Sequence, residues 1–243
     1  MVEGWDPQSI IRRHRGSWGP QSFLAGLAHQ GLVSLLAEGM LVHFGKGDVL
    51  VREGDVCDGV FLLLSSYVKV SASRYGGGQT LLAVRFAGDV IGEMAAIDGN
   101  TRCATVEVCS KEPVAAVRLE GAQFERAVAS VPDARRLLLA SVVRKLRTST
   151  RRRVDYAKAP VLLQLACLLV EMADEYGHAP RGRSVVIGAN LTQVEWGMLI
   201  GVSPRTVQRA LRELKSAGLI DPGRNRMVVK DVPGLRALFA ERL

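Results

Sequence analysis

The sequence predicts an α+β protein in which an N-terminal roll of short β-strands precedes one long helix and a C-terminal winged helical domain. Three observations predict this order. Glycine-containing turns separate short apolar runs between about residues 41 and 120. Neither glycine nor proline occurs from Asp133 to Lys158, which suits a long helix. Two closely spaced helix-start signals then follow, at Thr192 and Ser203.

The composition is that of a globular protein with a substantial core. The chain has 243 residues, of which 48% are apolar and 23% charged, and its length suits one or two domains. The dense apolar run Val161–Val170 is shorter than a membrane span, and no apolar segment of a secretory signal follows Arg15. Four cysteines are too few for a disulfide framework, so we expect a cytoplasmic protein without membrane association.

Charge is distributed unevenly along the chain. Residues 1–120 carry 11 basic and 13 acidic side chains, whereas residues 121–243 carry 21 basic and 11 acidic ones. The C-terminal half therefore has a net charge of about +10, a distribution typical of a partner that is a polyanion. A merely soluble basic surface is the alternative that charge alone leaves open.

The first 120 residues are expected to form the β-roll and what precedes it. Residues 1–20 carry no apolar period and are interpreted as a loose N-terminal arm, and residues 21–40 show a weak helical pattern. Apolar runs broken by turn residues every eight to twelve positions are typical of a barrel or roll. The expected strands are Val49–Val51, Val60–Leu64, Val68–Val70, Leu81–Val84, Thr105–Val108 and Val114–Leu119.

The long helix is predicted to carry a seam for a helix partner. Residues spaced alternately by three and four positions lie on one face of such a helix. The seam comprises Leu139, Val142, Leu146, Ser149, Arg153 and Tyr156. It is interrupted by polar Ser149 and charged Arg153, and packing against the helix's own domain is the alternative. We expect a homodimer.

The C-terminal segment predicts a winged helix-turn-helix. Thr192 suits the N-cap of a helix over Gln193–Ile200, Gly201 suits a left-handed turn, and Ser203 with Pro204 suits the start of a helix reaching about Ser216. Small Gly197 lets the two helices approach closely. Strands over Leu219–Ile220 and Met227–Val229 complete the wing.

The exposed side of the second helix is expected to contact DNA, because basic and amide side chains bind base edges and phosphates in the major groove. A plain helical hairpin with a solvated basic face is the alternative. The predicted DNA-binding residues are Thr192, Ser203, Pro204, Arg205, Thr206, Gln208, Arg209 and Arg212, with Arg224 and Arg226 in the wing.

A second signal, in the N-terminal half, indicates an anion site. Gly92–Glu93 follows a glycine turn, and Arg102 comes nine residues after Glu93. Arginine is the natural partner of a phosphate, and backbone N–H groups of a short helix over Glu93–Ala96 suit the same anion. From spacing alone, a direct ion pair between Glu93 and Arg102 is an equal alternative.

Taken together, these motifs resemble the cyclic-AMP receptor protein/fumarate-nitrate regulator (CRP/FNR) family of bacterial transcription regulators. The resemblance covers about residues 20–240. It is carried by Gly47–Asp48, Arg52–Asp55, Val68–Val70, Gly88–Glu93, Arg102–Val106 and Val202–Arg209. It implies a cyclic-nucleotide-binding, jelly-roll-like sensor domain over residues 21–130, a dimerisation helix over 131–158 and a winged helix-turn-helix domain over 160–243.

In members that bind cyclic nucleotides, the resemblance implies that Glu93 holds the ribose and Arg102 the cyclic phosphate. It implies that Ser149 with Thr150 contacts the purine, and Thr148 with Ser149 is the alternative pair, one residue earlier. The implied effector site comprises Gly92, Glu93, Met94, Arg102, Cys103, Ala104, Ser149 and Thr150. The chain departs from the family pattern at Ser66, where a hairpin glycine is usual. It also departs at Pro204 and Arg205, so the operator of the cyclic-AMP receptor is not assumed.

We therefore expect a DNA-binding regulator, not an enzyme, with a cyclic nucleotide as effector and cyclic AMP as the first choice. Double-stranded DNA with a palindromic operator is the expected partner, and RNA polymerase is a candidate partner. The cysteines lack the close cluster of an iron–sulfur protein and no histidine pair suits a metal, so we expect no iron–sulfur cluster, haem or metal.

Three alternatives stay open. One is a regulator that answers to cyclic GMP, cyclic di-GMP or redox state, with Cys103 as a thiol beside a cation. Another is a ligand-independent regulator in which Glu93 and Arg102 are a structural pair. The third, from another class, is a cyclic-nucleotide-binding module without DNA function.

Overall fold

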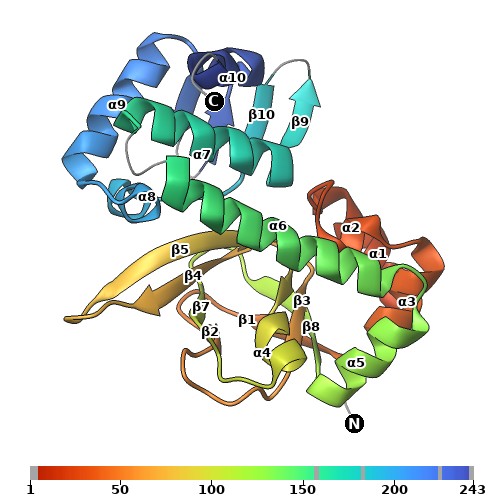
Figure 1. Cartoon of the computed structure of the whole chain (residues 1–243). Helices are drawn as coiled ribbons and strands as arrows, with labels where there is room; N and C mark the ends of the chain where they lie inside the picture. Colours follow the sequence, from red (N-terminus) through yellow and green to blue (C-terminus); the bar gives the residue numbers. More distant parts are fainter. Residues whose placement is uncertain (1–4, 156–158, 182–183, 224–225, 241–243) are drawn as a thin grey trace. The chain divides into compact units, whose positions relative to one another are not determined.

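The computed structural model describes residues 5–155, 159–181, 184–223 and 226–240, which form the α+β fold that the sequence predicts (Figure 1). The chain divides into two compact units, Met1–Val143 and Arg144–Leu243. The division falls within the long helix, and each unit is described by itself below.

The N-terminal unit is a roll of two four-stranded antiparallel sheets. Their strand orders are β1-β8-β3-β6 and β2-β7-β4-β5. The strands are β1 (Met40–Phe44), β2 (Val49–Val51), β3 (Val60–Leu63), β4 (Tyr67–Ser73), β5 (Gln79–Phe86), β6 (Val90–Ile91), β7 (Thr105–Val108) and β8 (Val114–Leu119). The six expected strands are all formed, and β1 and β6 are additional.

Two hydrophobic clusters fix this roll, because alternate side chains of a strand face opposite sides of a sheet. Phe61 and Leu63 of β3 point between the two sheets, whereas Val60 and Leu62 point to the other side, toward the helices. Strand β3 is therefore buried on both faces, which is why it reads in the sequence as a continuous apolar run.

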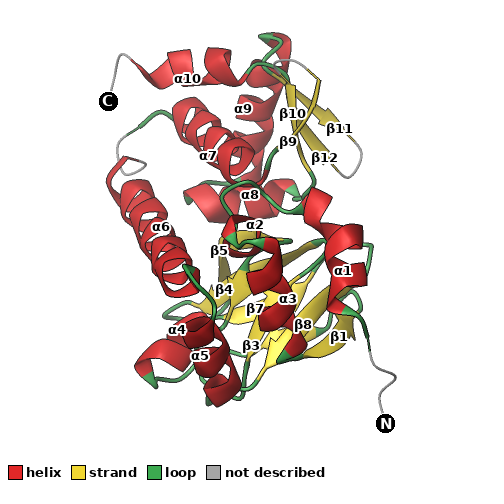
Figure 2. Cartoon of the chain, turned by 90° about the vertical axis from the view of Figure 1, so that its right-hand side faces the viewer, coloured by secondary structure: helices red, strands yellow, loops and turns green. Residues whose placement is uncertain are grey.

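Helices cover the outer face of the β1-β8-β3-β6 sheet (Figure 2). They are α1 (Pro7–His14), the 3-10 turn η1 (Arg15–Ser17), α2 (Phe23–Gly26), α3 (His29–Ala37) and α5 (Gly121–Ser130), while α4 (Glu93–Asp98) lies between β6 and β7. The weak helical pattern at residues 21–40 thus becomes two short helices, and β1 begins at Met40.

The expectation of a loose N-terminal arm is wrong for the described part of residues 1–20. The Asp6 carboxylate accepts hydrogen bonds from the N–H groups of Gln8 and Ser9 and caps α1. Ile11 is 2% exposed and Trp18 4%, and the Trp18 indole N–H donates to the Leu64 carbonyl at 3.0 Å. Helix α1 buries only Ile11, which is too sparse for an apolar period, although Asp6–Pro7 is a recognisable helix-start signal.

The departure at Ser66 has a conformational explanation. Ser66 joins β3 to β4 with φ of +61°, in the left-handed region that favours glycine. A backbone conformation that glycine adopts more readily therefore occurs at this hairpin, although a serine occupies the position.

The C-terminal unit begins within α6 (Ala134–Asp155), which corresponds to the long helix predicted from Asp133 to Lys158. The helices α8 (Gln193–Ile200) and α9 (Pro204–Ser216) have the predicted bounds, and α7 (Val161–Tyr176) precedes them. A sheet of order β11-β12-β10-β9 lies beside them, formed by β9 (His178–Arg181), β10 (Ser184–Ile187), β11 (Ile220–Gly223) and β12 (Arg226–Val229). Neither β9 nor α10 (Val232–Ala240) is among the elements that the sequence predicts.

The burial of Trp18 yields a stability prediction. Trp18→Ala should lower the free energy of unfolding of the N-terminal unit by about 3–5 kcal/mol, because it removes a buried aromatic side chain and leaves a cavity. Chemical unfolding followed by circular dichroism measures this. Trp18→Phe, which keeps a ring but not the indole N–H, should cost less, and the exposed change Arg12→Ala should be near neutral. A cost below about 1 kcal/mol for Trp18→Ala would show that the segment is outside the core.

Candidate functional site

Arg102, predicted to hold a phosphate, lies almost fully buried just before β7. Its side chain is 2% exposed. Its Nη1 donates to the Gly92 carbonyl at 2.9 Å, and its Nη2 donates to the Gly59 carbonyl and to the Asp58 carboxylate, the latter at 2.9 Å. Three of the five guanidinium N–H groups are used in this way, which leaves two to offer to an anion.

Asp58 is a member of this site that sequence reasoning missed. Its side chain is 69% exposed and also forms an ion pair with Arg118 at 3.3 Å. Burial raises the pKa of Asp58, but the hydrogen bond from Arg102, the local backbone and the two guanidinium charges lower it more. The pKa of this carboxyl therefore lies below its ordinary value. The spacing of the sequence suggested an ion pair between Glu93 and Arg102, and the structure shows an ion pair between Asp58 and Arg102.

Glycines allow the backbone to come this close to the guanidinium. Gly92 has φ of +84° and caps α4, and a Cβ added there would lie 2.5 Å from Arg102 Nη1. A Cβ on Gly59 would lie 2.8 Å from the Leu119 carbonyl oxygen. A side chain at position 92 would therefore displace Arg102, and one at position 59 would push against the neighbouring strand.

The other predicted effector residues of the N-terminal unit lie at the start of α4 and directly after Arg102 in the sequence. Glu93 is 4% exposed at the first position of α4, and Ala104 is 6% exposed. Met94 is 44% exposed, and its sulfur lies 4.0 Å from the Cys103 sulfur on the surface. A buried acid, a buried guanidinium and an exposed pair of sulfur atoms thus lie at the start of α4 and in the segment before β7.

Helix α6 presents two different faces. Ala134, Leu138 and Ser141 are buried in its N-terminal half. Leu139 and Leu146 of the predicted seam are 64% and 62% exposed. Of the remaining seam residues, Ser149 and Arg153 are exposed, Val142 is half-buried and Tyr156 lies outside the described residues; Thr150, predicted with Ser149 to contact a purine, is also exposed.

Two valines extend this exposed face beyond the predicted seam. Val143 is 36% exposed and Val154 is 69% exposed. The sequence pattern missed them because the seam was registered on Val142, which is partly covered by its own unit. The exposed apolar stripe is therefore Leu139, Val143, Leu146 and Val154.

The helix-turn-helix is held by the residues that predicted it. The Thr192 hydroxyl accepts from the Glu195 N–H, and the Glu195 carboxylate accepts from the Thr192 N–H at 2.7 Å. Gly201 has φ of +73°, and a Cβ on Gly197 would lie 2.5 Å from the Val202 carbonyl oxygen. The turn between α8 and α9 therefore tolerates no side chain at position 197.

Helix α9 carries the predicted recognition face. The Ser203 hydroxyl accepts from the Thr206 N–H, and Pro204 occupies the first helical position. Val207, Ala210 and Leu214 are buried on the opposite side. The predicted contact residues Thr192, Ser203, Pro204, Arg205, Gln208, Arg209, Arg212 and Arg226 are exposed and Thr206 is half-buried, while Arg224 lies outside the described residues.

Other features of the described residues bear on cofactors and membranes. Cys57, Cys103, Cys109 and Cys167 form no disulfide bond, and among the described residues no three histidine, cysteine or acidic side chains group in a way that could hold a metal ion. None of the described helices is long and apolar enough to span a membrane.

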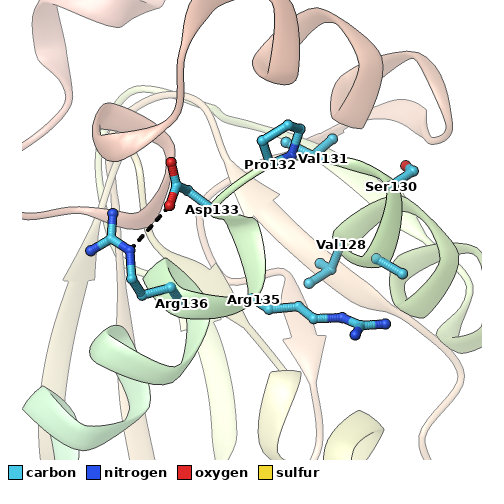
Figure 3. A pocket seen from close by; sticks show the side chains of 8 residues that line it. Val128, Ser130, Val131, Pro132, Asp133, Arg135 and Arg136 are labelled. Atoms are coloured by element: carbon cyan, nitrogen blue, oxygen red, sulfur yellow. Dashed lines mark hydrogen bonds and ion pairs between the residues drawn. The ribbon is translucent and has the colours of Figure 1, made fainter.

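A shallow cavity of about 450 Å³ lies where α5 meets α6 (Figure 3). Val128, Val131 and Pro132 line it together with Arg135 and the ion pair between Asp133 and Arg136. It includes none of the predicted site residues.

Comparison with known proteins identifies both halves of the chain. The family model of the cyclic nucleotide-binding domain matches residues 41–130, and that of the Crp-like helix-turn-helix domain matches residues 163–238. The chain belongs to the CRP/FNR family. It is thus a DNA-binding transcription regulator with a cyclic-nucleotide-binding domain, and the predicted family and fold class are confirmed.

Similar proteins extend over most of the chain. The "CRP-like cAMP-activated global transcriptional regulator" of Mycobacterium tuberculosis is 25% identical over 195 residues, 80% of this chain and 86% of that protein. FixK2 from Bradyrhizobium japonicum has a similar fold, with a TM-score of 0.69, 18% identity, and coverage of 82% of this chain and 96% of that one. The c-di-GMP responsive regulator CLP from Xanthomonas campestris gives a TM-score of 0.62 and 18% identity, covering 83% and 99%.

The geometry at Arg102 yields a prediction about Asp58. Asp58→Asn should lower the free energy of unfolding at pH 7 by at most about 1 kcal/mol, because the carboxylate is largely exposed. A depressed pKa contributes stability above the ordinary value of 3.8 and loses it as the pH falls through the folded-state pKa, so the difference between wild type and variant should shrink below about pH 4.

Urea unfolding of both proteins between pH 7 and pH 3 measures this difference. The matched control is Asp133→Asn, which removes the exposed ion pair with Arg136 at another part of the unit. A difference that stays constant down to pH 3 would mean that the charge of Asp58 does not contribute to holding Arg102.

Proposed function

We propose that this CRP/FNR-family regulator is a homodimer whose β-roll binds a small nucleotide effector, a cyclic nucleotide with cyclic AMP as the first choice. The observation that carries the effector proposal is the buried Arg102, which is held by two backbone carbonyls and Asp58. One of these carbonyls belongs to Gly92, the residue directly before the buried Glu93. A positioned guanidinium with two unused N–H groups suits a phosphate, and a buried carboxylate suits a sugar hydroxyl.

The choice among nucleotides rests on similarity. The Mycobacterium tuberculosis regulator is described as activated by cyclic AMP, and CLP as responsive to cyclic di-GMP. Cyclic AMP is placed first because the former is the relative with the higher sequence identity. Cyclic GMP and cyclic di-GMP are the comparison ligands.

The dimer proposal rests on the apolar stripe of α6. Leu139, Val143 and Leu146 follow each other at spacings of four and three, and all three point away from the buried face of the helix. A second copy of α6 laid along this stripe would remove these side chains from water. Such a dimer has two-fold symmetry and would place two α9 helices about one DNA turn apart, about 34 Å, which suits a palindromic operator.

A second candidate, a ligand-independent regulator of the same family, is favoured by one observation. Arg102 already has an anionic partner in Asp58, so its charge does not require a ligand. We place this candidate second because Asp58 is exposed and leaves two guanidinium N–H groups unused.

The proposal includes further expectations about partners and cofactors. RNA polymerase is a candidate partner, and the protein is placed in the cytoplasm. No iron–sulfur cluster or haem takes part in the proposed mechanism, and the sulfur pair of Cys103 and Met94 is treated as part of the protein surface.

The effector proposal is tested at Arg102. Arg102→Ala should weaken cyclic AMP binding by more than about 100-fold, because a charge-assisted contact in a buried site is lost. Calorimetric titration of wild type and variant with cyclic AMP, cyclic GMP and cyclic di-GMP measures the effect. Arg102→Lys keeps the charge without the planar fork and should give an intermediate loss. If wild type binds none of the three, or if Arg102→Ala binds as tightly as wild type, the effector proposal is wrong.

The DNA-binding proposal is tested at Arg205 and Arg226. Arg205 lies in the first turn of α9, the part of a recognition helix that enters the major groove, so Arg205→Ala should cost about 1–3 kcal/mol and relax preference at one base pair per half-site. Arg226 lies in the wing, and Arg226→Ala should weaken all sequences alike and reduce the salt slope by about one.

The measurement is affinity for a duplex selected by the wild-type protein from a random pool, and for its single-base variants, at two salt concentrations. An equal loss on every variant for Arg205→Ala would make Arg205 a phosphate contact and overturn its assignment to base recognition.

A further inference from the structure

A largely buried ion pair joins the end of α6 to α7. Arg152 Nε lies 3.2 Å from Glu171 Oε2, and the two side chains are 18% and 17% exposed. The other described ion pairs of the C-terminal unit, Lys215 with Asp221 and Arg236 with Asp174, have side chains between 39% and 58% exposed. The pair of Arg152 and Glu171, called the α6–α7 ion pair below, thus differs from them in burial.

The α6–α7 ion pair is not expected to contribute much to the free energy of folding. Burial raises the pKa of Glu171, and Glu175 on the same helix raises it further, while Arg152 and Arg151 of α6 lower it. The pKa remains above its ordinary value, so the attraction of the arginines does not fully offset the loss of water around the carboxylate. Buried pairs with this balance are often no more stabilising than neutral side chains of the same shape.

The position of the pair is more informative than its energy. Arg152 lies two residues before the exposed Val154 of the apolar stripe, on the helix that we propose to dimerise. Glu171 lies on α7, whose Leu165, Leu168 and Leu169 are buried in the winged unit and which packs against α9 and α10. The pair therefore connects the proposed dimer element to the helix that supports the recognition helix.

We propose that the α6–α7 ion pair is a positioning contact for DNA recognition. It fixes α7, and α9 packed on it, relative to the C-terminal end of α6. In a homodimer joined through α6, this contact gives the two recognition helices one defined spacing. The inference rests on the proposed dimer for its consequence at DNA, but the contact itself is tested within one chain.

The first experiment measures hydrogen exchange of the full-length protein. Glu171→Gln removes the charge and keeps the shape, so backbone amides of residues 148–155 should exchange about tenfold faster while those of α9 and the β-roll keep their rates. The matched control is Asp174→Asn, which breaks the α7 ion pair with Arg236 and should leave residues 148–155 unchanged. Exchanging the charges, Arg152→Glu with Glu171→Arg, should restore slow exchange.

Urea unfolding separates positioning from general stability. The double variant Arg152→Met with Glu171→Gln, which removes both charges, should unfold at a midpoint no lower than that of wild type, because a buried pair is often no more stabilising than neutral side chains of similar shape. Unchanged exchange at residues 148–155 would overturn the proposal. A lowered midpoint with faster exchange throughout the C-terminal unit would also overturn it, since the pair would then be an ordinary stabilising contact.

The second experiment measures how strictly the protein reads half-site spacing. The wild type should bind its selected duplex about tenfold more tightly than the same duplex with two base pairs inserted between the half-sites, and Glu171→Gln should reduce this ratio to less than about threefold. An unchanged ratio would overturn the proposal. If the wild type selects no two-fold symmetric duplex, the proposed dimeric function fails instead, and the exchange experiment still decides whether the contact positions α7.

Discussion

A buried guanidinium imposes the main constraint on the N-terminal unit. Arg102 is 2% exposed, and a buried charge is tolerated only when its N–H groups and its charge have partners. The carbonyls of Gly59 and Gly92 supply two acceptors and Asp58 supplies the charge. Asp58 and Gly59 directly precede β3, and Gly92 directly follows β6. The position of Arg102 therefore depends on the pairing of these two strands. The same partners leave part of the guanidinium for a ligand, which links the stability of the roll to its proposed effector.

The C-terminal unit depends on close backbone approach in the same way. The Val202 carbonyl packs closely against Gly197, where a Cβ would lie only 2.5 Å from the carbonyl oxygen. Gly201 supplies the left-handed turn. These two positions determine the angle between α8 and α9, and the caps at Thr192 and Ser203 fix where each helix begins. The exposed arginines of α9 thus owe their arrangement to residues that carry no charge.

The sequence predicted those elements whose signals are local. The bounds of α8 and α9 follow from caps and breakers next to them, and β7 and β8 from apolar runs between turns. Asp58 was not found because its contact with Arg102 joins residues 44 positions apart, and only the folded roll brings them together. The packing of the N-terminal segment was missed for a related reason, since Ile11 and Trp18 are single buried side chains that join a cluster of residues distant in the chain and do not repeat along a helix.

The charge of α6 adds a constraint that acts between copies. Residues 144–153 include six arginine or lysine side chains and no acid, and Arg153 lies at a seam position. In a two-fold dimer both copies carry this basic segment, so like charges of the two helices repel each other. Salt weakens this repulsion by screening the exposed charges. DNA binding by the same unit has the opposite dependence, because salt competes with the arginines for phosphates. The apolar contacts of Leu139, Val143 and Leu146 are the part of the proposed dimer that does not rely on charge, and they lie N-terminal to most of the basic segment. The apolar association surface and most of the basic segment therefore occupy different parts of α6. Added salt should weaken charge repulsion within the proposed dimer, and it should also weaken the binding of the α9 arginines to DNA.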